Sequence, residues 1–155
     1  MSQVTHRMDL NEFSNLAELN PTEALQYIQD LTKGGYLKKS GGGYGITEKG
    51  KVILRAQSPV ADGLEFQFYF AIGQPTGTVA KSIKEFYQAV KTIDTCSLEF
   101  HVSRGDFGNW IIAILKDEAL ASELENARQS ELSGERLRKR ITSVIERHYD
   151  SEALR

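Results

Sequence analysis

Residues 9–50 read D-L-N-E-F-S-N-L-A-E-L-N-P-T-E-A-L-Q-Y-I-Q-D-L-T-K-G-G-Y-L-K-K-S-G-G-G-Y-G-I-T-E-K-G, and they predict two helices followed by a hairpin. Asp9 can cap a short first helix, in which leucine and phenylalanine side chains recur at every third position. Asn20 is a favoured N-cap for a second helix, because Pro21 suits the first helical position and Glu23 completes a capping box. The pattern therefore predicts two consecutive helices joined by a tight turn.

A glycine pair and a hairpin follow the second helix. Gly34 and Gly35 are expected to end that helix, since only glycine enters the left-handed backbone region at little cost. Residues 36–39 and 44–47 are predicted as two short strands on either side of the tip S-G-G-G, and Thr47 can cap a further helix. The order of helix, turn, helix and hairpin is typical of a winged helix-turn-helix.

The hairpin sequence G-Y-L-K-K…Y-G-I-T-E-K-G-K-V-I-L resembles the wing of MarR- and PadR-like regulators, in which the pattern Y-x-L-T-x-x-G recurs. The resemblance implies a winged helix-turn-helix domain over residues 1–57 and a role in transcriptional regulation through binding to double-stranded DNA. Winged helices also serve as protein-binding modules, so a protein-protein interaction module that does not bind DNA is the alternative function.

The N-terminal domain departs from that family because its first helix is missing. Only eight residues precede Asp9, which are too few for the extra helix with which such domains begin. Phe13 and Leu31 would then lack a covering element. We hypothesise that the C-terminal helix, from Leu137 to His148, packs on these two side chains, within one chain or across a dimer.

The predicted recognition helix is poor in cations. Its apolar stripe of Leu25, Ile28 and Leu31 leaves an outward face that carries two carboxylates and one lysine. Because phosphate neutralisation supplies much of DNA affinity, we expect the lysines around the hairpin to contact the DNA backbone, while Thr22 and Gln26 read base edges. The predicted DNA-binding residues are Thr22, Gln26, Tyr27, Lys33, Lys38, Lys39, Lys49 and Lys51.

A second domain is predicted over residues 64–150, after a linker at residues 58–63 in which proline, glycine and polar residues cluster. Its strongest strand signal is L-E-F-Q-F-Y-F-A-I, residues 64–72, whose alternating apolar side chains are expected to face one way. Helices are expected after Ser82, around 97–102, from Asp106, over 118–128 and over 133–149. The predicted fold class is α+β: an abbreviated winged helix-turn-helix plus a small strand-and-helices C-terminal domain.

Three phrases of the second half, F-Y-F-A-I-G-Q-P-T-G, A-K-S-I-K-E-F and S-L-E-F-H-V-S-R-G-D-F-G-N-W-I, make it similar to a small domain of unknown function found mainly in archaeal proteins. The resemblance covers about residues 64–148. It implies no catalytic residues, because no activity is associated with that domain.

One cluster in the second half, His101, Arg104, Asp106 and Trp110, has two interpretations. A histidine beside a carboxylate is typical of a general base or a metal ligand, and His101 with Arg104 can form a pocket for an anion. The structural interpretation is that Asp106 caps a helix, Trp110 packs in the core and His101 bonds a backbone group. We expect the structural role, because no second histidine or cysteine lies at ligand spacing.

The composition of the 155-residue chain, with a net charge of −2, is ordinary for a globular protein. No apolar run approaches the roughly 20 residues that span a bilayer, and the N-terminus lacks the apolar segment of a signal peptide, so we expect a cytoplasmic protein. The single Cys96 excludes an intramolecular disulfide and is expected to be buried. We expect no enzyme activity, no cofactor and no metal.

We expect a homodimer, because one helix-turn-helix binds DNA weakly and regulators usually pair two half-sites. The second domain is then expected to mediate dimerisation or to sense an effector.

Overall fold

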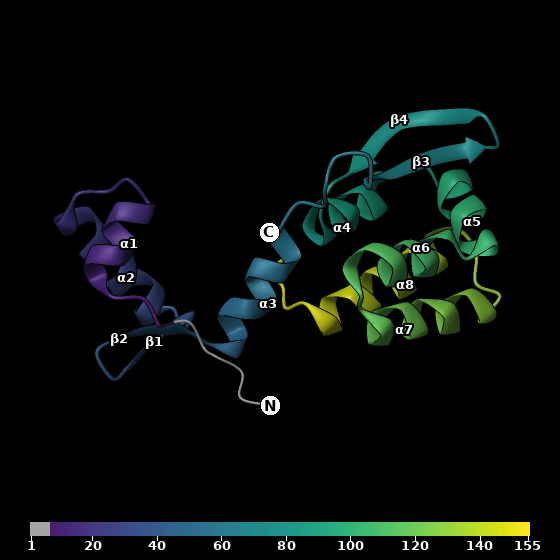
Figure 1. Cartoon of the computed structure of the whole chain (residues 1–155). Helices are drawn as coiled ribbons and strands as arrows, with labels where there is room; N and C mark the ends of the chain where they lie inside the picture. The colour runs from purple at the N-terminus through teal and green to yellow at the C-terminus, as the bar shows by residue number, and fades with distance from the viewer. Residues whose placement is uncertain (1–6) are drawn as a thin grey trace. The chain divides into compact units, whose positions relative to one another are not determined.

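The computed structural model describes residues 7–155 and combines helices with two antiparallel hairpins, so the chain is an α+β protein (Figure 1). It divides into two compact units, Met1–Leu54 and Arg55–Arg155, within helix α3 (Glu48–Gln57). The division lies before the predicted linker at residues 58–63. Part of that segment is fixed on the C-terminal unit, since the backbone N–H of Val60 donates to the carbonyl oxygen of Lys81 at 2.7 Å.

Two helices and one hairpin precede α3 in the N-terminal unit. They are α1 (Leu10–Leu16), α2 (Pro21–Lys33), β1 (Leu37–Ser40) and β2 (Gly43–Ile46). Both predicted helix starts are confirmed. The Asp9 carboxylate accepts from the backbone N–H of Glu12 at 2.8 Å, and Asn20 forms the complete capping box with Glu23.

The hairpin forms one residue from the predicted limits, with Leu37 paired to Ile46. Met8 adds a single antiparallel bridge to Tyr44 on the outer side of β2. Gly43 is required at this point, because a Cβ there would lie 2.8 Å from the carbonyl oxygen of Met8. The segment just before α1 therefore lies against the hairpin as a rudimentary third strand.

The core of the N-terminal unit is small. Ala24 and Ile28 of α2 are buried, whereas two leucines predicted to share the stripe, Leu25 and Leu31, remain 39% and 37% exposed. Leu16 at the end of α1 is 68% exposed. Residues 7–9, which precede α1, form no helix, and the three leucines remain partly in water.

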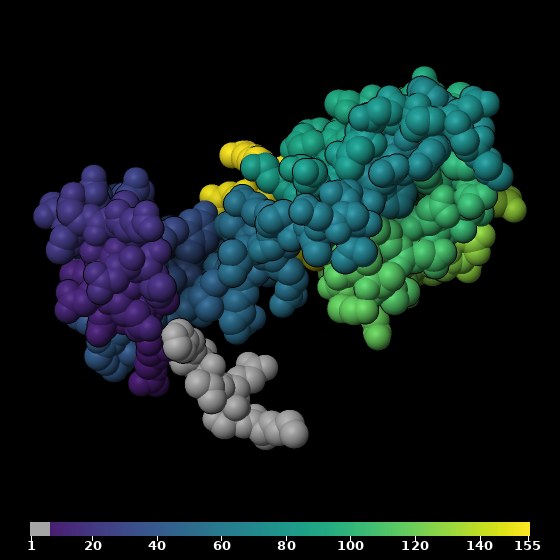
Figure 2. Space-filling view, turned by 45° about the horizontal axis from the view of Figure 1, so that its top comes forward, coloured from purple at the N-terminus to yellow at the C-terminus, as the bar shows by residue number. Residues whose placement is uncertain are grey.

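The C-terminal unit consists of a hairpin and a set of helices. Its elements are β3 (Phe66–Ala71), β4 (Gln74–Ala80), α4 (Ile83–Thr92), α5 (Thr95–Arg104), α6 (Asp106–Trp110), a π-helical turn (Ile111–Leu115), α7 (Glu118–Gln129) and α8 (Gly134–His148). The hairpin lies over α4 and α5, and α7 and α8 lie on the other side of these helices (Figure 1). The space-filling view shows the hairpin and the helices as one continuous surface (Figure 2).

The first strand of the unit differs from its prediction. Of its five alternating apolar side chains, Phe66 and Phe68 are buried, but Leu64 is 44%, Phe70 is 45% and Ile72 is 81% exposed. Two register shifts in the β3–β4 pairing, on either side of Tyr69, bend the strand and break the alternation. Ile72 and Gly73 alone separate β3 from β4, which begins at Gln74.

An aromatic cluster forms the core beneath the hairpin. Phe66 contacts Phe86 and Phe107 edge to face, with ring centroids 5.5 and 5.3 Å apart, and Phe86 stacks on Trp110. The apolar face of α4 is buried through Ile83, Phe86, Tyr87 and Val90, and Ile93 directly after the helix is buried as well. Cys96, by contrast, is exposed, so its predicted burial is wrong.

The hypothesis that the C-terminal helix covers Phe13 and Leu31 is wrong. The apolar face of α8 is already buried within the C-terminal unit, where α8 packs against α4, α5 and α7. The buried residues of that face are Leu137, Ile141, Val144 and Ile145. No apolar stripe of α8 is left for another element.

Arg138 of α8 forms hydrogen bonds with the C-terminal end of α4. Its guanidinium, 14% exposed, donates to the carbonyl oxygens of Val90 and Ile93, which have no partner within α4 because they lie at its C-terminus. Arg138→Met should lower the free energy of unfolding by about 2 kcal/mol, since it leaves these carbonyls unpaired. Urea unfolding followed by the fluorescence of Trp110, the chain's one tryptophan, measures this change.

The matched control is Arg136→Met, which removes an exposed arginine from the same helix. Its effect should stay within about 0.5 kcal/mol. Equal losses in the two variants would contradict the role assigned to Arg138.

Candidate functional site

The predicted DNA-binding residues lie on three elements of the N-terminal unit. Thr22, Gln26, Tyr27 and Lys33 lie on α2, and all four are exposed. Lys38 and Lys39 are exposed on β1, whereas Lys49 and Lys51 belong to the first turns of α3. The structure brings Lys38 of β1 and Lys51 of α3 together in the lining of one hollow beside the hairpin.

The outward face of α2 is not cationic. The Gln26 side-chain amide donates to the Asp30 carboxylate at 3.1 Å, so one of its two donors is already used. Glu23 is engaged in the capping box. On this face, the side chain of Thr22 and the second amide donor of Gln26 are the groups that remain for contacts with DNA bases.

The two lysines of α3 have different local roles. The Lys49 ammonium donates to the carbonyl oxygen of Gly34 at 3.0 Å and lies 4.5 Å from the centroid of the Tyr36 ring. It therefore caps the C-terminus of α2 and ties α3 to it, a structural role. Lys51 forms an ion pair of 2.7 Å with Glu48, one turn earlier on α3.

A hollow of about 480 Å³ lies beside the hairpin and is lined by Arg7, Lys38 and Lys51. Glu48 is the one carboxylate in its lining. Arg7, which was not among the residues predicted from the sequence, stands next to the Met8 bridge, and a Cβ on Gly41 would lie 3.0 Å from its Nη1. No local sequence pattern could have identified Arg7, because its position beside the hairpin depends on the pairing of Met8 with Tyr44.

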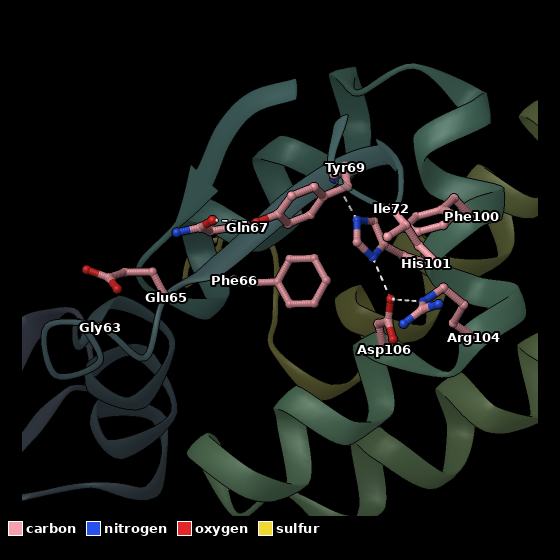
Figure 3. Close-up of a pocket in the computed structure, with 11 residues that line it drawn as sticks. Gly63, Glu65, Phe66, Gln67, Tyr69, Ile72, Phe100, His101, Arg104 and Asp106 are labelled. Atoms are coloured by element: carbon pink, nitrogen blue, oxygen red, sulfur yellow. Dashed lines mark hydrogen bonds and ion pairs between the residues drawn. The ribbon is translucent and has the colours of Figure 1, made fainter. Parts of the chain in front are cut away.

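The second cluster lies in the C-terminal unit and is centred on His101, which is 3% exposed. Its Nε2 lies 2.8 Å from the backbone N–H of Tyr69, and its Nδ1 lies 2.8 Å from the Asp106 carboxylate (Figure 3). A backbone N–H can only donate, so Nε2 accepts and the ring proton resides on Nδ1, from which it is donated to Asp106. Both nitrogens of the neutral ring are therefore occupied.

The environment keeps this ring uncharged. Burial lowers the pKa of His101 from its ordinary value of 6.5, although the adjacent Asp106 acts in the opposite direction. A neutral ring with both nitrogens bonded has no free lone pair for a proton or a metal. Among the residues that the structure describes, no group of three histidine, cysteine or carboxylate side chains is placed to hold a metal ion.

The predicted role of Asp106 as a helix cap is wrong. Helix α6 begins at Asp106 itself and is preceded by Gly105, whose φ of 72° requires glycine's freedom. The Asp106 carboxylate instead accepts from His101 and from Arg104 Nε, the latter at 3.1 Å. Trp110 is buried, as predicted, and its Nε1–H donates to the carbonyl oxygen of Leu64 at 2.8 Å.

An open hollow of about 640 Å³ lies above this cluster. Figure 3 shows its wall built from β3, the β3–β4 turn and α5, with the Arg104 side chain at one end and Glu65 toward the other. The Arg104 guanidinium lies 5.1 Å from the centroid of the Phe100 ring. Tyr69 and Phe100 were not predicted as site residues, since nothing in the sequence around either residue marks it as part of a hollow.

The chain matches no family model, no curated protein and no solved structure. None of the helices within residues 7–155 has both the length and the apolar character that crossing a membrane requires. The two surfaces above are therefore interpreted from their own geometry.

The His101 network predicts a pH dependence of stability. The folded protein binds the His101 proton less readily than the unfolded chain, because the pKa of His101 is lowered on folding. Its contribution to the free energy of unfolding is fully present above pH 6.5 and is lost as the pH falls from 6.5 toward the folded pKa. His101→Gln should flatten this decline, measured by urea unfolding between pH 7 and pH 5.

His148→Gln is the matched control, because His148 also lies beside a carboxylate, that of Glu123 at 3.0 Å. This variant should keep the steeper decline of the unaltered protein. The assignment fails if His101→Gln leaves the pH dependence unchanged. A direct check is the titration of the His101 ring by NMR, which should give a pKa below 6.5.

Proposed function

We propose that the protein binds double-stranded DNA through its N-terminal unit and acts in transcriptional regulation. The single observation that carries the proposal is the basic hollow beside the hairpin, where Arg7, Lys38 and Lys51 face one carboxylate. Lys39 adds a further exposed cation on the same strand. Clustered cations next to a hairpin suit the phosphates of a DNA backbone.

The hairpin, and not α2, supplies most of the affinity in this proposal. Phosphate neutralisation drives binding, and α2 carries Glu23 and Asp30 on its exposed side. Thr22 and Gln26 then contribute the base contacts, with Tyr27 and Lys33 beside them on the same helix. The binding should accordingly depend strongly on salt and weakly on sequence.

A homodimer completes the proposal, because two N-terminal units can occupy two half-sites and raise a weak single-site affinity. The C-terminal unit is the candidate for dimerisation or for sensing an effector.

One observation favours the alternative of a protein-interaction module. Leu16, Leu25 and Leu31 are all more than one third exposed on α1 and α2. Exposed leucines on adjacent helices suit the apolar face of a partner protein. This surface and the basic hollow use different residues, so substitutions can separate the two functions.

The deciding experiment measures binding to a fluorescein-labelled duplex of random sequence by anisotropy across a salt series. The unaltered protein should bind at low salt, with an affinity that falls as salt rises. The double substitution Lys38→Gln with Lys39→Gln should weaken binding and reduce the slope of log K against log salt by about 2, because two phosphate contacts are lost.

Lys139→Gln with Arg140→Gln is the matched control, since it removes two exposed cations from α8. It should leave the affinity and the salt slope unchanged. Absence of binding at the lowest salt would reject the DNA proposal. Absence of duplex binding together with a self-association that Leu25→Glu abolishes would instead favour the alternative.

A further inference from the structure

We propose that the hollow above His101 binds a small molecule that carries a carboxylate on a flat apolar body. Its volume of about 640 Å³ falls within the range of roughly 300 to 1,000 Å³ that is usual for small-molecule sites. The proposal concerns the C-terminal unit alone and does not depend on DNA binding.

The walls of the hollow suit a flat apolar group. Phe66, Tyr69 and Phe100 contribute aromatic rings, and the β3–β4 turn contributes Ile72 at the rim (Figure 3). Ile72 is 81% exposed, the highest exposure among the large apolar side chains that the structure describes. A ligand body between these side chains would remove apolar surface from water, which is the main favourable contribution to such binding.

Arg104 supplies the recognition of the carboxylate. Its Nε donates to Asp106 at 3.1 Å, and its guanidinium lies over the Phe100 ring. A guanidinium has five N–H donors, and no described residue accepts a hydrogen bond from the Nη atoms of Arg104. Their parallel donors match the two oxygens of a carboxylate.

The guanidinium is held in place before any ligand arrives. The backbone N–H of Tyr69 fixes His101, His101 donates to Asp106, and Asp106 holds Arg104 Nε. This chain of bonds joins β3 to α5 and α6. Preorganisation of this kind lowers the entropic cost of binding. His101 is therefore a positioning residue, because neither of its ring nitrogens is left for a ligand.

The charges around Arg104 favour a singly charged anion over a phosphate. His101 is neutral, and Asp106 offsets part of the charge of Arg104. A doubly charged phosphate would meet one cation next to an existing carboxylate. Glu65 lies toward the other end of the hollow, away from Arg104 (Figure 3), so it leaves a monoanion at Arg104 undisturbed.

The test uses benzoate as the probe, with benzamide and inorganic phosphate for comparison, and monitors the full-length protein by NMR. Benzoate should cause saturable shifts of the Tyr69 and Phe100 signals and of the Arg104 Nε–H. Benzamide has the same shape without the charge and should bind about tenfold more weakly. Phosphate should not displace benzoate.

Arg104→Gln should weaken benzoate binding about tenfold, because the charged donor pair is lost. The matched control is Arg128→Gln, since Arg128 is 41% exposed against 48% for Arg104 and is also paired with a carboxylate, that of Glu125. It should bind benzoate as the unaltered protein does. Arg104→Lys keeps the positive charge but lacks the two parallel N–H donors of the guanidinium, so it should also lose most of the affinity.

Unchanged Trp110 fluorescence shows that each variant is folded. The proposal is overturned by the absence of saturable shifts, by equal affinity for benzoate and benzamide, or by equal losses in the Arg104 and Arg128 variants. Stronger binding of phosphate than of benzoate would also overturn it. None of these measurements involves DNA, so their failure is separate from that of the DNA-binding proposal.

Discussion

The hydrogen bond from the Tyr69 backbone N–H to His101 Nε2 is the constraint on which the C-terminal unit depends. A two-stranded hairpin is marginal by itself, and this bond attaches the free edge of β3 to α5. It also fixes the ring proton of His101 on Nδ1. As a result, Nδ1–H donates its hydrogen bond to the Asp106 carboxylate. The ring placed in this way contacts Phe66 and Phe107 of the aromatic core, and Asp106 in turn holds Arg104.

Local signals allowed the helix starts to be predicted from the sequence. Asp9, Asn20 and Ser82 each accept a hydrogen bond from a backbone N–H two or three residues later, so the pattern and its cause lie within one turn. Ser82 also shows the limit of such a motif. Glu85 does not complete a capping box with Ser82 but accepts from the backbone N–H of Lys81 at 2.8 Å. The capping position was predictable, whereas the partner of the carboxylate was not.

Contacts between residues that are distant in the sequence could not be predicted from its local patterns. Asp106 has the residue type of an N-cap, but it is the first residue of α6, and its carboxylate accepts from the ring of His101 on α5 instead. The alternation from Leu64 to Ile72 predicted one buried face, but two register shifts with β4 expose its second half. Arg7 became a candidate residue only through the bridge between Met8 and Tyr44. Each case depends on a pairing between elements, which composition and periodicity do not encode.

The N-terminal unit has few buried apolar side chains. Its two candidate functions, binding of DNA and binding of a protein, therefore do not exclude each other. Of α2, Ala24 and Ile28 are buried, while Leu25 and Leu31 stay partly in water. Covering these leucines would remove apolar surface from water and stabilise the unit, and it would not occupy the cations of the hairpin. A partner protein or second copy on α1 and α2 is therefore compatible with DNA on the hairpin. The exposed leucines then bear on how the unit assembles, and the basic hollow bears on what it binds.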